Sequence, residues 1–231
     1  MNMRIAGRGS VPVGEYDKIS ISGCGRLFGE VRCNNFSASG SSKGESITCA
    51  ARFKASGTSA FSGQVNAQSI RTAGSFSCGA LNAEEISCSG SVKCAGDVAC
   101  RQLSVSGSMR VDGDIEAGSV RVAGALHCGM TLRAESIELQ ADKQMQLKSI
   151  AGGSIRTRRK RISVFFKRRV CVTSAIEGDA LDLEFVSAPR VTGRTVIIGK
   201  GCRIDLVEYR ERVEIAPGAQ IGKVEKNESD R

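Results

Sequence analysis

The sequence has no tryptophan, one histidine, three prolines and only 4% aromatic residues in 231 positions. So few rings indicate a narrow core of small and aliphatic side chains, with no room for stacked aromatics. No apolar run is long enough to cross a bilayer, and residues 1–8 lack the apolar stretch of a signal peptide. Helical periodicity is also hard to find, which argues against helical fold classes. We therefore expect a cytoplasmic protein with an all-β fold.

What the sequence has instead is a repeat marked by glycine. One spacing in the series is 16 residues and the others are 17. The series is Gly23, Gly40, Gly57, Gly74, Gly90, Gly107 and Gly124. So strict a period predicts stacked copies of one small unit. Serine or alanine precedes each glycine, so we expect a corner there, with a positive φ that other side chains disfavour.

Apolar residues fall at fixed distances from each glycine and alternate with polar ones. One pair lies four and two residues before the glycine, as in Ile19 and Ile21. A second pair lies eight and ten residues after it, as in Val31 and Cys33, and a single apolar residue such as Leu27 lies four residues after it. Alternation at period two predicts short strands, and three of them per 17 residues predict a triangular coil.

Because each coil repeats the pattern of the one before, equivalent strands should stack in parallel. The expected fold is a single-stranded parallel β-helix, a right-handed solenoid of about twelve coils with ~17 residues per coil. The spacing of 16 predicts a one-residue deletion after Gly74, and the pair Ile47 and Cys49 marks a second irregularity near Gly44. A β-sandwich would give more variable spacings.

The period divides one continuous domain into four parts. Residues 1–16 are expected to be an N-terminal tail or cap, and residues 17–140 the regular coils. Residues 141–222 should continue the same domain as less regular coils, and residues 223–231 are polar enough to be a tail. Corners in the less regular part are predicted around Gly178, Gly193 and Gly218.

Ten cysteines would suggest disulfides in a secreted chain, but here we expect reduced thiols. Six of them fall at inward offsets, where a thiol serves as a small apolar side chain: Cys33, Cys78, Cys88, Cys94, Cys100 and Cys128. Cys78 and Cys94 occupy the same offset in adjacent coils. No two cysteines have C-x-x-C spacing, so neither a metal site nor a cofactor is expected.

Catalytic residues are not apparent, and we do not expect an enzyme. His127 lies at an outward offset and is interpreted as a solvated surface residue. The acidic pairs Glu84/Glu85 and Asp112/Asp114 fall near corners and are expected on the surface without partners. No motif of a serine hydrolase, a phosphate-binding loop or a zinc protease is present.

Two segments keep one enzymatic alternative open. Ile198–Ile204 and Ile215–Gly222 look like the hexads of hexapeptide acyltransferases, which build a left-handed β-helix. The main repeat is 17 rather than 18 residues and has no consistent stride of six. Acyl transfer is therefore the weaker hypothesis, and no small-molecule substrate is expected.

The net charge of +9 is concentrated in one segment. Its eight cations within fourteen residues are Arg156, Arg158, Arg159, Lys160, Arg161, Lys167, Arg168 and Arg169. One interpretation is a solvated outward face or a protruding loop. The other is a surface for an anionic partner, for which phospholipid headgroups of a membrane are a better candidate than nucleic acid.

Several segments together point to a known family. Ile19–Gly23 (ISISG), Val105–Ser108 (VSGS) and Gly113–Ile115 (GDI) resemble the corner repeats of the bactofilins, the bacterial polymer-forming cytoskeletal proteins. Gly199–Tyr209 (GKGCRIDLVEY) is similar to longer members from bacilli. The resemblance spans residues 19–222. It implies a right-handed β-helix that polymerises end to end without nucleotide, often beneath the membrane, as a scaffold in cell shape, wall synthesis or motility.

Elementary physics also favours self-association of such a fold. A β-helix leaves an unpaired strand edge at each end, and another copy can continue the ladder there. The expected contact residues are Val11, Val13 and Tyr16 in the first coil and Val213, Ile215 and Ile221 in the last. The expected partners are further copies of the chain, a second bactofilin or recruited proteins, with a monomeric adaptor on an anionic surface as the alternative.

Overall fold

A computed structural model describes residues 1–140, 143–159 and 169–227. Every element in these ranges is a β-strand, and the strands pair in parallel as a β-solenoid. The described strands make about 13 turns, close to the expected twelve. Two compact units divide the chain at residues 113 and 114, a boundary that does not coincide with residue 140, where the repeat loses its regularity.

Unit 1, residues 1–113, alternates long and short strands. They are β1 (Asn2–Ile5), β2 (Arg8–Val11), β3 (Gly14–Ile21), β4 (Cys24–Leu27), β5 (Glu30–Ala38), β6 (Ser41–Gly44), β7 (Ser46–Ala55), β8 (Thr58–Phe61), β9 (Gln64–Thr72), β10 (Ser75–Cys78), β11 (Ala80–Cys88), β12 (Ser91–Cys94), β13 (Val98–Val105) and β14 (Ser108–Val111). Residues 1–16, expected as a tail or cap, thus contain β1 and β2, which pair with β3 and β4.

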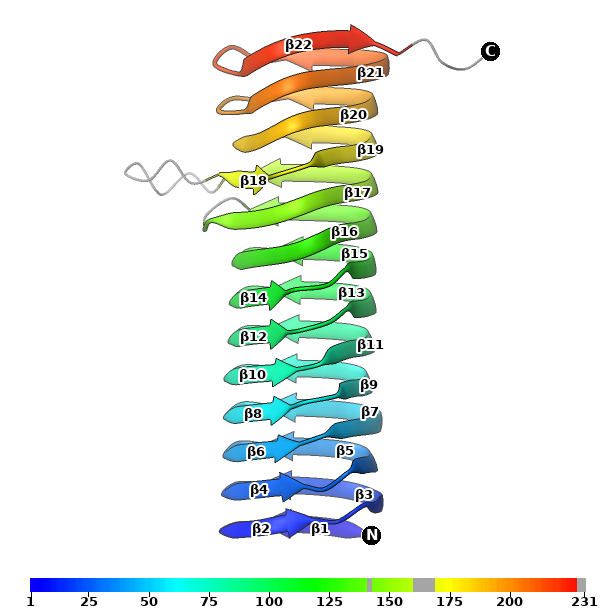
Figure 1. Cartoon of the computed structure of the whole chain (residues 1–231), viewed down its shortest axis with the longest axis vertical. Helices are drawn as coiled ribbons and strands as arrows, with labels where there is room; N and C mark the ends of the chain where they lie inside the picture. Colours follow the sequence, from blue (N-terminus) through cyan, green and yellow to red (C-terminus); the bar gives the residue numbers. More distant parts are fainter. Residues whose placement is uncertain (141–142, 160–168, 228–231) are drawn as a thin grey trace. The chain divides into compact units, whose positions relative to one another are not determined.

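Unit 2, residues 114–231, has longer strands. They are β15 (Ile115–Val122), β16 (Ala125–Gln140), β17 (Met145–Arg158), β18 (Val170–Val172), β19 (Ala175–Leu183), β20 (Val186–Ile198), β21 (Arg203–Ile215) and β22 (Gln220–Lys226). Within each unit the nearer strands in Figure 1 run to the right and the fainter strands behind them run to the left as the chain climbs. That sense of winding is right-handed, as expected.

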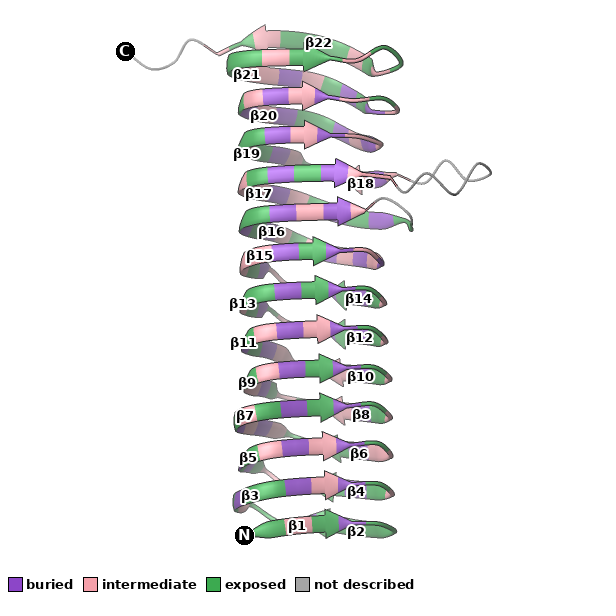
Figure 2. Ribbon diagram, turned by 180° about the vertical axis from the view of Figure 1, so that it is seen from behind, coloured by how far each residue is buried: buried purple, intermediate pink, exposed green. Residues whose placement is uncertain are grey.

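Each coil buries one side of its strands because side chains alternate across a strand. In β5 the buried residues are Val31, Cys33, Phe36 and Ala38, and the residues between them are more exposed. Figure 2 shows the same alternation of buried and exposed segments along the strands of both units. The apolar pairs predicted from their distances to glycine therefore form the core.

One inward position was missed, two residues after the marker glycine. It is buried in unit 1 as Ser42, Ser59, Phe76, Val92 and Met109. The two serines satisfy each other, since Ser42 Oγ donates a hydrogen bond of 2.7 Å to Ser59 Oγ. Polar residues in the early repeats hid the apolar pattern at this offset.

The expectation that the core has no room for stacked rings is wrong for unit 1. Phe36 and Phe53 are register partners, and their rings stack with centroids 4.8 Å apart. Phe61 and Phe76 continue the cluster at centroid distances of 5.7 and 5.4 Å from Phe53. Few rings are enough because each one contacts its counterpart in the next coil.

Both predicted irregularities are confirmed. Phe76 pairs with Val92, so the coil that contains Gly74 is one residue shorter than its neighbours. Near Gly44, Cys33 pairs with Cys49 at a spacing of 16, and the spacing returns to 17 at Phe36 and Phe53 through a β-bulge. Corners and bulges thus absorb length changes while the inward residues stay in register.

The corner glycines are needed for a different reason than predicted. Among the described residues, the glycines with positive φ are Gly29, Gly201 and Gly218, and none belongs to the marker series. At the marker position the backbone passes directly over the coil below. A Cβ on Gly107 would overlap the carbonyl oxygen of Gly90.

Candidate functional surfaces

The last coil of unit 2 exposes an apolar layer. Ile215 on β21 is 44% exposed and Val224 on β22 is 39% exposed, whereas Val213 and Ile221 are half-buried. Their register partners one coil earlier are Val196, Ile198, Ile204 and Val207, each 0–1% exposed. The same kind of side chain at the same register position is covered in one coil and open in the next. We call Val213, Ile215, Ile221 and Val224 the C-terminal edge layer.

The backbone at this edge is open as well. β22 pairs with β21 over Arg203–Tyr209, so Arg212–Ile215 has no strand on its outer side in the described part of the chain. Outward residues form ion pairs along the edge, Arg212 with Glu214 and Lys223 with Glu225. The Glu225 carboxylate raises the pKa of Lys223. Charges are thus matched within each strand, and the inward row stays apolar.

The first coil of unit 1 is covered differently. Of the residues expected there as contacts, Val11 is 0% and Tyr16 8% exposed, while Val13 is 66% exposed. The Tyr16 hydroxyl donates a hydrogen bond of 3.0 Å to the Pro12 carbonyl, which holds the phenol ring over its own coil. Val11 and Tyr16 are therefore core residues of the first coil, and Val13 is the expected contact that remains accessible.

The basic segment does not present all its cations freely. Arg158 forms a bidentate pair with Asp182 on β19, and Arg156 lies 3.7 Å from the same carboxylate. The Asp182 carboxylate raises the pKa of Arg158 by accepting its hydrogen bonds. The Arg159 guanidinium lies 5.0 Å from the Phe185 ring centroid. Lys160, Arg161, Lys167 and Arg168 lie outside the described residues, and Arg169 is half-buried.

Sequence reasoning missed the residues that fix the base of this segment. Thr157 Oγ1 donates to the Glu184 carbonyl at 2.9 Å and accepts from the Glu184 amide at 2.7 Å. Phe185 follows with a φ of 54°, an uncommon conformation for a bulky residue. A threonine at an inward strand position was the available signal.

This geometry sharpens the lipid-binding prediction. We expect replacement of Lys160, Arg161, Lys167 and Arg168 by serine to abolish co-sedimentation with vesicles rich in phosphatidylglycerol at low salt. The matched change Arg156→Ser should leave binding nearly unchanged, because Asp182 already offsets that charge. Wild-type protein that ignores the vesicles even at low salt would contradict an anionic partner.

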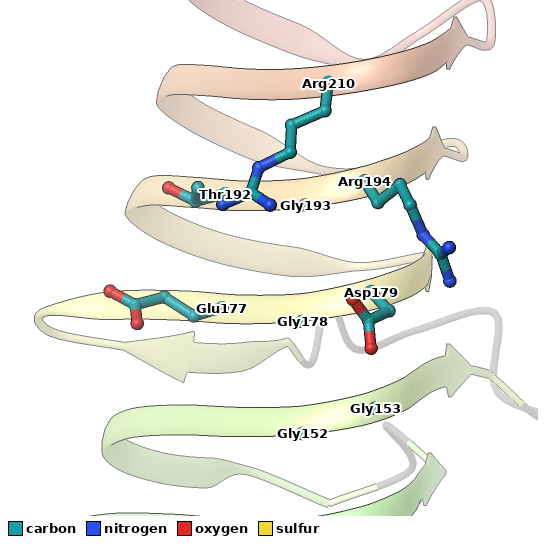
Figure 3. A pocket seen from close by; sticks show the side chains of 9 residues that line it. All are labelled: Gly152, Gly153, Glu177, Gly178, Asp179, Thr192, Gly193, Arg194 and Arg210. Carbon is teal, nitrogen blue, oxygen red and sulfur yellow. The ribbon is translucent and has the colours of Figure 1, made fainter. Parts of the chain in front are cut away.

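A groove on unit 2 is the clearest concave surface there. It has a volume of about 350 Å³, and its floor includes Gly152, Gly178 and Gly193, which are register partners on β17, β19 and β20. Figure 3 shows Arg210 reaching down over Thr192 and Gly193, with the side chains of Glu177, Asp179 and Arg194 around the floor. A Cβ on Gly178 would overlap the Gly152 carbonyl oxygen. The glycines therefore serve the tight bend, and the lining holds no histidine or cysteine.

The remaining predicted residues are placed without a shared site. His127 is half-buried between Leu126 and Cys128, and it faces outward as expected. The acidic pairs are not without partners: Glu85 lies 3.7 Å from Arg71, Asp112 pairs with Arg110 at 2.9 Å, and Asp114 accepts a hydrogen bond from the Thr131 amide. These are neighbours across or along strands, and no catalytic pair results.

The cysteines largely follow the predicted inward pattern. Five of the six are buried, and Cys100 is half-buried. Cys78 and Cys94 are register partners, as their shared offset predicted. Cys49 and Cys202 are buried too, whereas Cys24 is exposed. All ten are free thiols.

Comparisons with known proteins give limited information. The chain is 39% identical over 71 residues to YhbF, an uncharacterized protein of Bacillus subtilis (strain 168). The similar stretch covers 30% of this chain and 30% of YhbF. No protein-family model and no solved structure matches the chain. In the described part of the chain, no helix has the length and apolar character needed to span a membrane.

Proposed function

We propose that this protein is a polymer-forming scaffold that assembles through its terminal coil without nucleotide or metal. The contrast in exposure between Ile215 and its register partner Ile198, 44% against 0%, carries the proposal. An apolar layer left open at a strand edge is a template for another copy of the same coil. The role is that of a cytoskeletal scaffold rather than an enzyme, as the bactofilin resemblance implies.

The chemistry of the edge supports a protein partner over a small ligand. Aliphatic side chains and unpaired backbone groups are complementary to a further strand, which adds hydrogen bonds and apolar contact together. The flanking ion pairs of Arg212 and Lys223 are satisfied within their own strands, so a second copy meets little net charge. The scaffold would act in the cytoplasm, at the inner face of the membrane where the basic segment binds lipid, and position other proteins there.

Arginine substitutions in the C-terminal edge layer test this proposal. Ile215→Arg and Ile221→Arg should each convert filaments or large oligomers into a smaller, β-rich particle, because burying an added cation in a contact is costly. The fold should survive, since each side chain has a neighbouring coil on one side only. Analytical ultracentrifugation, electron microscopy and circular dichroism measure size, shape and fold.

Two controls make the result specific. Ala180→Arg adds the same charge at an exposed position on β19 and should leave assembly intact. Val13→Arg asks whether the first coil also takes part. Wild-type assembly should be equal with ATP, GTP or EDTA. A wild-type protein that stays monomeric at high concentration would refute the scaffold and favour the monomeric adaptor on an anionic surface.

A further inference from the structure

Two thiols meet inside unit 1, in the coils that contain β5 and β7. Cys33 and Cys49 are register partners, and their sulfur atoms lie 3.4 Å apart. Neighbouring strands lie about 4.8 Å apart, within the Cα separation of about 4.4–6.8 Å that disulfides span. The two backbones are already close enough for a bond between the sulfurs.

The local backbone can also give. The ladder shifts by one residue between Cys33 and Asn35 on β5, opposite the stretch from Cys49 to Arg52 on β7. A bulge interrupts the regular hydrogen bonds of the ladder at that point. The two sulfurs need to approach only from van der Waals contact to bonding distance, and the adjacent bulge offers the freedom to do so.

A surface depression leads to this pair. Cys49 lines it together with Ala50, Asn66, Ala67 and other residues of neighbouring coils, and its volume is about 510 Å³. Asn66 donates to Thr48 Oγ1 at 3.3 Å, while its own carbonyl oxygen is buried without a partner in the described structure. A hydroperoxide is a small hydrogen-bond donor of the size that such a depression admits.

The two thiols differ in character. Cys49 donates a hydrogen bond to the Cys33 sulfur, which lowers the pKa of Cys33, whereas that bond and burial raise the pKa of Cys49. Cys33 is also slightly more exposed, 5% against 3%. Since the thiolate is the nucleophile, Cys33 is the sulfur that reacts first and Cys49 is the one that resolves the product.

We propose that Cys33 and Cys49 form a reversible disulfide on exposure to hydroperoxide, joining the coils of β5 and β7 covalently. Cys33 attacks the peroxide O–O bond and becomes a sulfenic acid, and one water is released. The Cys49 sulfur then displaces the hydroxyl group from the Cys33 sulfur, so the S–S bond forms and a second water leaves. Two thiols are oxidised by two electrons in total, and one hydrogen peroxide is reduced to two waters.

Peptide mapping tests the linkage directly. The full-length reduced protein is treated with hydrogen peroxide, quenched with catalase, alkylated in denaturant and digested with trypsin. Cleavage after Arg32, Lys43 and Arg52 leaves Cys33 and Cys49 on separate peptides with one cysteine each. We expect these two peptides to appear joined, to separate on reduction with dithiothreitol, and to join equally at all protein concentrations.

Two variants give the test its controls. Cys49→Ser should stop the reaction at the Cys33 sulfenic acid, trapped by dimedone, with no joined peptide. Cys24→Ser removes an exposed thiol and should leave the linkage unchanged. In oxidised wild type, amide exchange of β5 and β7 should slow by about tenfold or more, because closing a loop of this length restrains local opening. Full alkylation of both Cys33 and Cys49 after Cys24 has been oxidised would overturn the proposal.

Discussion

Replacement of Val98 by aspartate is expected to unfold the coils around β13. Val98 is 1% exposed, stacks on Leu81 of β11 and faces the apolar interior. A carboxylate there would have neither water nor a cation, which costs about 4 kcal/mol or more. A typical domain has a stability of about 5–15 kcal/mol, so loss of cooperative melting by circular dichroism is the expected result.

The adjacent position provides a matched control. Ala99 follows Val98 on the same strand and is exposed, so Ala99→Asp adds the same charge on the outer face. Its melting temperature should stay near that of wild type. Equal melting of both variants would contradict the inward register of β13.

Replacement of Gly107 by valine should destabilise unit 1 by about 3 kcal/mol through overpacking. The added Cβ would overlap the Gly90 carbonyl oxygen, so the two coils must separate at that corner. Chemical denaturation measures the loss. Gly7→Val is the control, because a Cβ on Gly7 meets nothing within 4 Å. A Gly107 variant as stable as the Gly7 variant would show that the corner is looser than the structure indicates.

The repeat made most of the fold predictable because its signals are periodic. The pairs exemplified by Ile19 and Ile21, and the shifts near Gly44 and after Gly74, follow directly from residue spacing. The fold itself explains why the conformation of Gly107 was mispredicted. Turning tightly and passing close to the neighbouring coil both require glycine, and only coordinates separate the two.

The candidate surfaces were less predictable because exposure depends on neighbours rather than residue type. Ile198 and Ile215 have the same side chain and the same register position, and only the missing next coil separates their exposure. The pairing of Arg158 with Asp182 joins residues 24 apart, a distance that the 17-residue period does not suggest. The extra residues between β17 and β18 displaced that partner.

Those extra residues also make the corner between β17 and β18 a natural insertion point. Ile150 pairs with Ile176 at a spacing of 26, yet Met145 still pairs with Val170 and Leu147 with Val172. The ladder therefore closes on both sides of additional sequence without losing register, as surface loops generally tolerate added length. A fluorescent reporter placed between Arg161 and Lys167 would leave both the first strand and the last strand untagged. Live imaging with such a fusion can follow the protein in cells without blocking the edge layer through which it is proposed to assemble.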